Sequence, residues 1–255
     1  MDRRFNLIRR FCVVLACVLA LSACQQLKHN VIDLTEHERS TQKDKLEQAL
    51  RWWRASFQMD WDKAASPHWH LGPLIAEQVI LPVLQHHGGE LRLWRFHRRA
   101  VGDAGGHRFS FLYYTDSGTA ANVEVLIRQN VILQNLRTEG VVSTVSIGPY
   151  GSQDGVAVSA TSDPRWTAVM QETWPHFLMG VSRMWLEQVI LFSEKVSLES
   201  SFEEEDLDGL DETGLEEHYI KVQSELSGIW LKEGKHAYLH HLNAVYAYQP
   251  MFHVF

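Results

Sequence analysis

The chain contains 14 histidines, and some are spaced so that several imidazoles could bind one metal ion. His68 and His70 would point to the same side of a strand, because successive side chains of a strand alternate between its faces. His97 and His107 occur in the next strands along the sequence. Imidazole nitrogen is a common zinc ligand, but a zinc site needs three or four protein ligands. The histidine pattern therefore raises one alternative, a metal-binding protein or metalloenzyme that uses His68, His70, His97 and His107.

Signatures of catalysis are missing from the sequence. His236 and His240 have the i, i+4 spacing of a zinc protease helix, but the residue after His236 is Ala237, so the general base of that motif is absent. Gly-x-Ser-x-Gly, which marks the nucleophile of α/β-hydrolases, does not occur. These absences favour a non-catalytic protein.

A second candidate site is a cationic, aromatic stretch in a protein of net charge −7. An anionic ligand or an acidic partner could bind there, and the protein's own acidic segment could also neutralise it. Aromatic side chains within the stretch would supply an apolar floor. The candidate partner-binding residues are Arg92, Trp94, Arg95, Arg98, Arg99 and Arg108.

The acidic segment runs from Glu203 to Glu212, where seven of ten residues are acidic. Its setting between two predicted helices suggests a calcium EF-hand, but the twelfth position of the best frame is Leu215, where a bidentate Glu is required. A solvated acidic loop fits the sequence better. A basic partner surface is the other interpretation, and it leads to a third hypothesis, a periplasmic immunity or inhibitor protein.

The N-terminal segment has the layout of an export signal. Arginines precede an apolar run of about 11 residues, from Phe11 to Leu21, whereas a membrane-spanning helix needs about 20. The run ends in Leu21-Ser22-Ala23-Cys24. This segment resembles the signal peptide and lipobox of bacterial lipoproteins, and the resemblance is confined to residues 1–24. It implies cleavage before Cys24 and a covalent lipid on the Cys24 sulfur.

Such an anchor implies a location. Stable attachment needs two or more acyl chains, and lipoproteins of this class carry two or three. Gln25 occupies the position where the retention signal of inner-membrane lipoproteins has Asp, so the resemblance implies the outer membrane, with the protein facing the periplasm. No cofactor is expected other than the lipid on Cys24.

Removal of residues 1–23 changes the charge balance. Lys+Arg falls from 24 to 20 and Asp+Glu from 31 to 30, so the net charge falls from −7 to −10. An acidic body argues against binding to nucleic acid. Cys24 would be the one mature cysteine, which excludes disulfides within the mature chain.

Hydrophobic periodicity predicts the elements that must position these groups. We expect a helix over 36–58, a short strand over 68–71, a helix over 73–87, strands over 91–99 and 107–115, a helix over 120–138 and a strand over 141–147. The order from 68 to 147 is that of a ferredoxin-like split β-α-β core. Two helices should follow, and Pro175 should kink or split the first.

The predicted class is therefore α+β, with a ferredoxin-like core, an N-terminal helix and a C-terminal helical pair. The expected domains are a signal peptide over 1–23, a tether over 24–34, an α+β domain over 35–160 and a helical region over 161–255 that packs on it. The leading functional hypothesis is a lipid-anchored outer-membrane protein that acts as a binding or assembly component of the cell envelope. Its expected partners are the membrane, through the lipid, and an envelope protein or anionic ligand.

Overall fold

A computed structural model describes residues 50–60, 67–99, 106–151, 153–201 and 212–246 of the 255-residue chain. All of these residues belong to one compact unit that begins at Leu50. Cys24, the signal segment, the tether and the acidic stretch 203–211 lie outside the described residues, so the predictions on them stay predictions.

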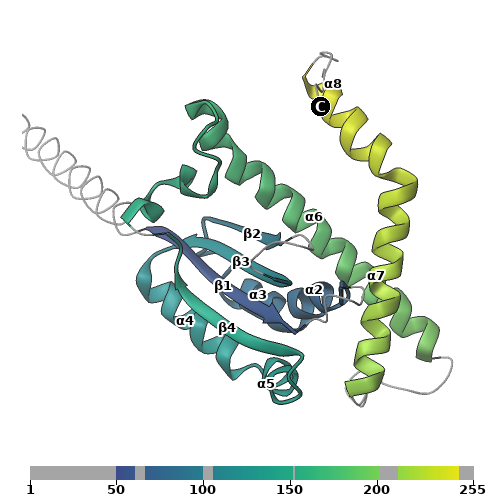
Figure 1. The fold of residues 1–255 in the computed structure, drawn as a ribbon. Coiled ribbons are helices and arrows are strands. Elements are labelled where there is room, and N and C mark those ends of the chain that lie inside the picture. Colours follow the sequence, from purple (N-terminus) through teal and green to yellow (C-terminus); the bar gives the residue numbers. More distant parts are fainter. Residues whose placement is uncertain (1–49, 61–66, 100–105, 152, 202–211, 247–255) are drawn as a thin grey trace, which may run out of the picture. The chain divides into compact units, whose positions relative to one another are not determined.

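The described chain contains a four-stranded antiparallel sheet (Figure 1). Its strands are β1 (Arg51–Met59), β2 (Leu93–Arg98), β3 (Arg108–Thr115) and β4 (Val142–Pro149). They lie in the order β2-β3-β1-β4, and every neighbouring pair is antiparallel. With helices between β1 and β2 and between β3 and β4, this is the split β-α-β arrangement. The predicted α+β class is confirmed.

The first strand was placed wrongly from the sequence. Residues 51–59 form β1, not the end of a helix over 36–58, and residues 36–49 lie outside the described part. His68 to Leu71, the predicted first strand, is a turn that leads into a helix. Apolar residues at spacings of three and four suggested a helix, but the same stretch also alternates, with Trp53, Ala55 and Phe57 on one face. Pairing with β3 on one side and β4 on the other decides in favour of the strand.

Helices cover one face of the sheet. Between β1 and β2 the chain forms α2 (Leu71–Leu74), the π-helix η1 (Ile75–Ile80) and α3 (Leu81–His87). The wide turns of η1 end just before Pro82, which has no N–H for a helical hydrogen bond. Between β3 and β4 lie α4 (Ser117–Gln129) and α5 (Val131–Thr138).

The predicted helix over 120–138 is broken at Asn130, which has an extended backbone. The Asn130 side chain caps α5 by accepting a hydrogen bond from the N–H of Leu133 at 2.9 Å. Its amide nitrogen donates to the carbonyl of Gln78 at 2.8 Å. The Asn130 side chain therefore connects α5 to η1 within the helical layer.

After β4, the 3-10 helices η2 (Gln153–Val156) and η3 (Val158–Thr161) lie on the second face of the sheet. They cover a small apolar cluster that includes Trp52, whose indole N–H donates to the carbonyl of Val158 at 2.9 Å. The phenol of Tyr114 donates to the carbonyl of Val156 at 2.6 Å. One half of the second face is thereby closed.

The long helix α6 (Ala168–Ser201) runs along the edge strand β2 and includes Pro175 without being split (Figure 1). Ser182 accepts a hydrogen bond from the N–H of Phe96 at 3.0 Å, so α6 satisfies part of the outer edge of β2. The helix α7 (Glu212–Gly234) packs against α6 through buried residues such as Val189 and Val222, and Lys195 pairs with Glu225 at 2.8 Å. The π-helix η5 (Lys235–His240) and α8 (His241–Val245) continue α7.

Candidate functional site

The second face of the sheet carries a row of small polar groups where η2 and η3 do not cover it. Strand pairing aligns Ser110 with Ser56 and His97, and Ser56 with Ser146. The hydroxyls of Ser56 and Ser110 are 3.2 Å apart. His97 and Ser146 are exposed at the two ends of the row. Ser56 and Ser110 are themselves buried, so this half of the face presents His97 and Ser146 to solvent.

Arginines flank that row. Arg54 lies over the ring of Tyr150 at 5.7 Å, and Arg108 donates to the side-chain oxygen of Gln58 at 3.0 Å. Arg95 is buried and donates to the carbonyl of Thr161 at 3.2 Å, which ties η3 to the sheet. None of the residues in β1, β2, β3 or β4 is acidic. The sheet is therefore cationic within an acidic protein.

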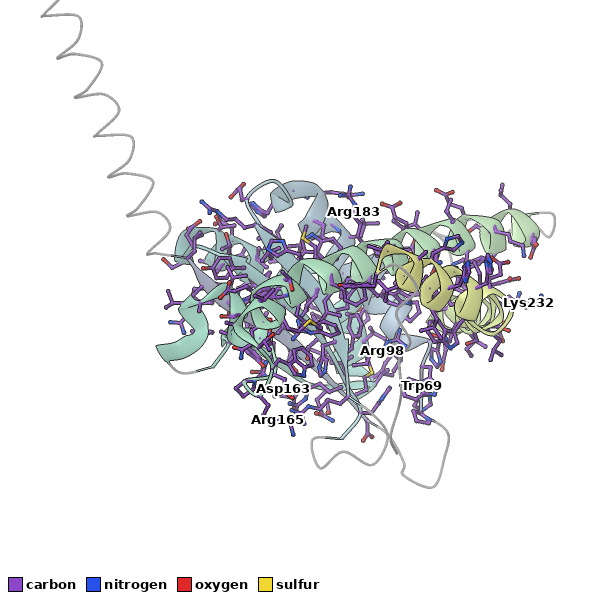
Figure 2. The ribbon with its side chains drawn as sticks, turned by 90° about the horizontal axis from the view of Figure 1, so that it is seen from above. Trp69, Arg98, Asp163, Arg165, Arg183 and Lys232 are labelled. Atoms are coloured by element: carbon purple, nitrogen blue, oxygen red, sulfur yellow. The ribbon has the colours of Figure 1, made fainter. Side chains whose placement is uncertain are left out.

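One exposed cation near η3, Arg165, is already neutralised. Arg165 and Asp163 lie beside each other at the edge of the molecule (Figure 2), with Nη2 and Oδ2 2.6 Å apart. The side-chain contact with Arg165 holds the pKa of Asp163 at about 2. Because Arg165 is paired with Asp163, the net positive charge of this region comes from the arginines of the strands.

The predicted partner-binding residues of the hairpin divide between the two faces of the sheet. Trp94 is buried in the main core, where it packs edge-on against Phe96 at 5.6 Å. Arg92 is exposed just before β2, and Arg99 follows β2, with its N–H donating to the carbonyl of Arg108 at 3.1 Å. Alternation along the strands places Arg95 and Arg108 on the second face. The six residues thus do not form one surface.

Arg98, the sixth of these residues, is packed on the helical side of the sheet, beside Phe109 and Trp185. Its guanidinium lies 5.0 Å from the ring of Trp185 and so close to Gly72 that a β-carbon there would collide with it. Its Nη2 is buried and has no hydrogen-bond partner among the described residues. Burial lowers the pKa of Arg98 to about 10. Packing against an aromatic ring, rather than ion pairing, holds this cation.

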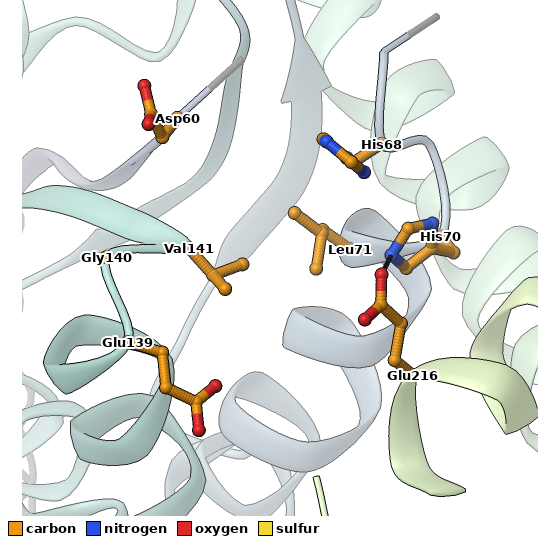
Figure 3. A pocket seen from close by; sticks show the side chains of 8 residues that line it. All are labelled: Asp60, His68, His70, Leu71, Glu139, Gly140, Val141 and Glu216. Atoms are coloured by element: carbon orange, nitrogen blue, oxygen red, sulfur yellow. Dashed lines mark ion pairs between the residues drawn. The ribbon is translucent and has the colours of Figure 1, made fainter. Parts of the chain in front are cut away.

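The other candidate site is a pocket of about 250 Å³ beside the C-terminal end of β1. Figure 3 shows its lining side chains, with Asp60 and Glu139 across the pocket from His70 and Glu216. Four segments build it: the end of β1, the turn before α2, the connection from α5 to β4, and the start of α7. Leu71 and Val141 supply apolar wall, so the pocket combines carboxylates and imidazoles with apolar side chains.

His68, His70 and Glu216 form the centre of the pocket. Each offers one ligand-type atom, and the three atoms lie within 4.8 Å of one another. His70 Nε2 and Glu216 Oε1 are 3.2 Å apart, whereas the rings of His68 and His70 meet edge-on at 5.6 Å. His70 is buried, and His68 and Glu216 are exposed.

Burial sets the charge of the pocket imidazole. It lowers the pKa of His70 below the ordinary value of 6.5, against the opposing effect of Glu216. His68 and His107 also lower the pKa of His70, because neighbouring imidazoles disfavour a second positive charge. The neutral form of His70 therefore dominates at neutral pH.

His107 supports the turn that carries His68 and His70. Its Nε2 lies 3.4 Å from the carbonyl oxygen of His68, and its ring meets Trp69 edge-on at 5.3 Å. Burial lowers the pKa of His107, and nearby Arg98 lowers it further. The structure thus brings His68, His70 and His107 together, while His97 is on the second face of the sheet. His97 is not part of the grouping.

Glu216 is the member that the sequence pattern did not find. Thr213 and Glu216 have the spacing of a helix-starting capping box, but α7 starts at Glu212, so Thr213 lies inside the helix. An acidic residue facing a histidine 146 positions earlier leaves no local pattern. Its partner becomes visible only when α7 packs beside the turn before α2.

A serine–histidine pair also lies in the helical layer, but it is enclosed. Ser193 Oγ is 2.9 Å from His218 Nε2, and both residues are buried. Nearby, the phenol of Tyr219 donates to Glu77 Oε2 at 2.9 Å and accepts from Gln78 at 2.7 Å. None of these residues lines the pocket beside Glu216. The buried pair therefore helps to join α6 and α7.

Three more histidines gather on the exposed surface of η5 and α8. The ring centroids of His236 and His240 are 5.0 Å apart and nearly parallel, and His241 lies 5.3 Å from His240. Their nitrogens do not converge on one point as those of His68 and His70 do. This surface cluster provides an internal control for any metal-binding experiment.

No protein-family model matches the chain, and no curated protein matches it. Among solved structures, the crystal structure of TsrL is similar over 76% of this chain, with 13% identity and a TM-score of 0.33. The match covers 55% of the TsrL chain, so this chain spans about half the length of that protein. Similarity at this level carries no argument about function. In the described ranges, we find no helix with the length and apolar character needed to span a bilayer.

Proposed function

We propose that this protein is a lipid-anchored component of the bacterial outer membrane that faces the periplasm and binds an anionic ligand or the acidic surface of another envelope component. The second face of the sheet is the proposed binding surface. The observation that carries this proposal is the charge distribution of the sheet, because four strands without a carboxylate form a cationic face in an acidic protein.

The anchor rests on the sequence pattern that ends at Cys24. A diacylglyceryl group on that sulfur, with a further acyl chain on the new N-terminus, would hold the protein at the membrane. The proposed role is non-catalytic, since neither the second face nor the enclosed Ser193–His218 pair offers a nucleophile in a cavity.

Mass spectrometry of the protein isolated from membranes tests the anchor. We expect a mature chain that begins at Cys24 and carries the mass of the lipid, and a Cys24→Ser variant that is neither lipidated nor retained in the outer membrane. A native protein with an unmodified residue 24 would contradict the anchor and leave the sheet-face proposal to be tested separately.

The sheet face is tested by removing two of its arginines. We expect the variant Arg54→Gln with Arg108→Gln to lose at least tenfold in affinity for anionic envelope components, because a hydrogen bond to a charged group contributes about 1.5–3 kcal/mol. The matched control is Arg128→Gln with Arg137→Gln, which removes the same charge from the exposed surface of α4 and α5.

The readout is quantitative binding of envelope fractions to the immobilised protein at several salt concentrations. Equal losses in the two double variants would show an effect of net charge alone, and that result would reject the second face as the binding surface.

A further inference from the structure

The pocket beside α7 has the composition of a metal site with an open position. Two imidazoles and a carboxylate form the set of three protein ligands found in several catalytic zinc sites, which leave the fourth position to water or substrate. The same ligand types suit other divalent transition metals. Here they come from His68, His70 and Glu216.

The distances fit this interpretation. Zinc bonds of about 2.0–2.1 Å in a tetrahedral arrangement place two ligand atoms about 3.4 Å apart. His70 Nε2 and Glu216 Oε1 already lie 3.2 Å apart. The remaining ligand atom is within 4.8 Å of these two and belongs to the exposed His68, whose side chain has room to adjust its rotamer.

An ordinary ion pair explains the contact less well. Although the two atoms lie within ion-pair distance, His70 Nε2 is buried and makes no aligned hydrogen bond to any described residue. A buried nitrogen that makes no aligned hydrogen bond is poorly satisfied, and a metal ion would use its lone pair.

The surroundings extend the site. Asp60 and Glu139 line the opposite wall of the pocket, so the lining contains carboxyl groups in addition to that of Glu216. Among the described residues, the pocket has no Lys or Arg in its lining to balance them, which favours a bound cation. His107 reaches the carbonyl of His68 and supports the turn that presents both imidazoles. Groups behind the ligands commonly hold them in position for the metal.

We propose that this pocket binds one divalent transition metal ion, with Zn²⁺ as the reference ion, through His68, His70 and Glu216. The remaining coordination position faces the space lined by Asp60 and Glu139. Because Glu216 belongs to α7 and the two histidines precede α2, the ion also fastens the C-terminal helices to the sheet domain. This site is independent of the sheet-face binding proposed above.

The test uses the full-length protein, purified without a polyhistidine tag and stripped with a chelator. Zn²⁺ binding is measured by competition with a chromophoric chelator, and the visible absorption of bound Co²⁺ reports its coordination. We expect one tightly bound Zn²⁺ per chain and a Co²⁺ spectrum typical of a low coordination number. Thermal unfolding should shift upwards when Zn²⁺ is added.

Two exposed ligands allow variants that keep the fold. His68→Ala and Glu216→Ala should each weaken Zn²⁺ binding at least 100-fold, since loss of a supporting group alone costs about 10–100-fold. The control His236→Ala with His240→Ala removes two exposed histidines from the surface cluster, and its affinity should stay within threefold of the parent. Circular dichroism confirms that each variant is folded.

A parent protein that binds no stoichiometric Zn²⁺ would overturn the proposal. So would His68→Ala and Glu216→Ala variants with unchanged affinity, or a loss confined to the His236 and His240 control. The sheet-face variant Arg54→Gln with Arg108→Gln should bind Zn²⁺ as the parent does, so the two functional proposals can fail separately.

Discussion

The two faces of the sheet are built from the same strands but present different chemistry. On the helical side of β3, the rings of Phe111 and Tyr113 stack at 5.1 Å, and Phe109 stacks on Phe96 at 5.2 Å. On the second face the same strand presents Arg108 and Ser110 before it reaches the small cluster under η2 and η3. Residues one step apart thus belong to a packed core and to a polar surface.

Because of this difference, we expect residues of the helical face to determine stability and residues of the second face to determine binding. The helical face is enclosed by helices, and its side chains are fixed by shape. The uncovered half of the second face contributes little apolar burial, and the exposed His97 and Ser146 with the half-buried Arg54 and Arg108 are its groups available for recognition. Substitutions on the two faces should therefore differ in kind, with losses of stability on one and losses of binding on the other.

Phe111→Ala should have the largest effect. The side chain is fully buried among aromatic rings, and truncation of a buried Phe costs about 3–5 kcal/mol. The free energy of unfolding in urea measures the loss. A cost below about 1 kcal/mol would show that the helical face is loosely packed and would break the contrast between the faces.

Tyr219→Phe should follow, at about 1–3 kcal/mol, because it leaves Glu77 and Gln78 with unpaired groups behind the helical face. Burial raises the pKa of Glu77, and the phenol hydrogen bond from Tyr219 opposes that rise. Urea unfolding provides the readout. An unchanged stability would mean that water takes over both contacts, and α7 would then be held by apolar packing alone.

Acid should destabilise the helical layer through His218. Burial lowers the pKa of His218 below 6.5, and nearby Lys221 on α7 lowers it further, while Ser193 on α6 faces its Nε2. Between the folded pKa and 6.5 the unfolded chain binds more protons, so stability is complete above pH 6.5 and decreases as the pH falls below it. One group contributes at most about 1.4 kcal/mol per pH unit.

Unfolding free energies from pH 8 to pH 5, measured in the presence of a chelator, give this slope. In His218→Gln the slope should be smaller, although His70 and His107 contribute with the same sign. If the unfolding free energy falls with pH as steeply in the variant as in the parent, groups other than His218 cause the acid sensitivity.

Ser110→Ala should have the smallest effect on stability, about 1 kcal/mol or less, because it removes one hydroxyl contact, to Ser56 at 3.2 Å. Its neighbour Phe111 points to the opposite face, so the two variants compare adjacent positions of one strand. If Ser110→Ala costs as much as Phe111→Ala, the second face is part of the core, and its role in binding would have to be abandoned.

Local patterns predicted much of the fold. The alternation of residues 107–115 gave β3, and the β-branched run after Gly140 gave β4. The pattern failed at β1, where an apolar spacing compatible with a helix is overridden by two neighbouring strands. It also missed the break at Asn130, where a side-chain cap and a contact to Gln78 outweigh continuous helix propensity.

The residues of the candidate sites likewise divide into those that local patterns predicted and those that they missed. His68 and His70 are two residues apart, so their neighbourhood could be expected from the sequence, although they lie on a turn and not on a strand. Glu216 could not be expected, because only the packing of α7 brings it to His70. His97 was grouped with them by its position in the sequence, but strand alternation turns it to the other face.

The contact between Ser182 and the N–H of Phe96 bears on how a second polypeptide could join this sheet. Backbone groups at a free sheet edge can accept an additional strand, and here α6 obstructs the β2 edge. The β4 edge has no strand beside it in the described part of the chain. Among the described residues the two edges of the sheet therefore differ, because a helix obstructs β2 and no strand pairs with the outer side of β4.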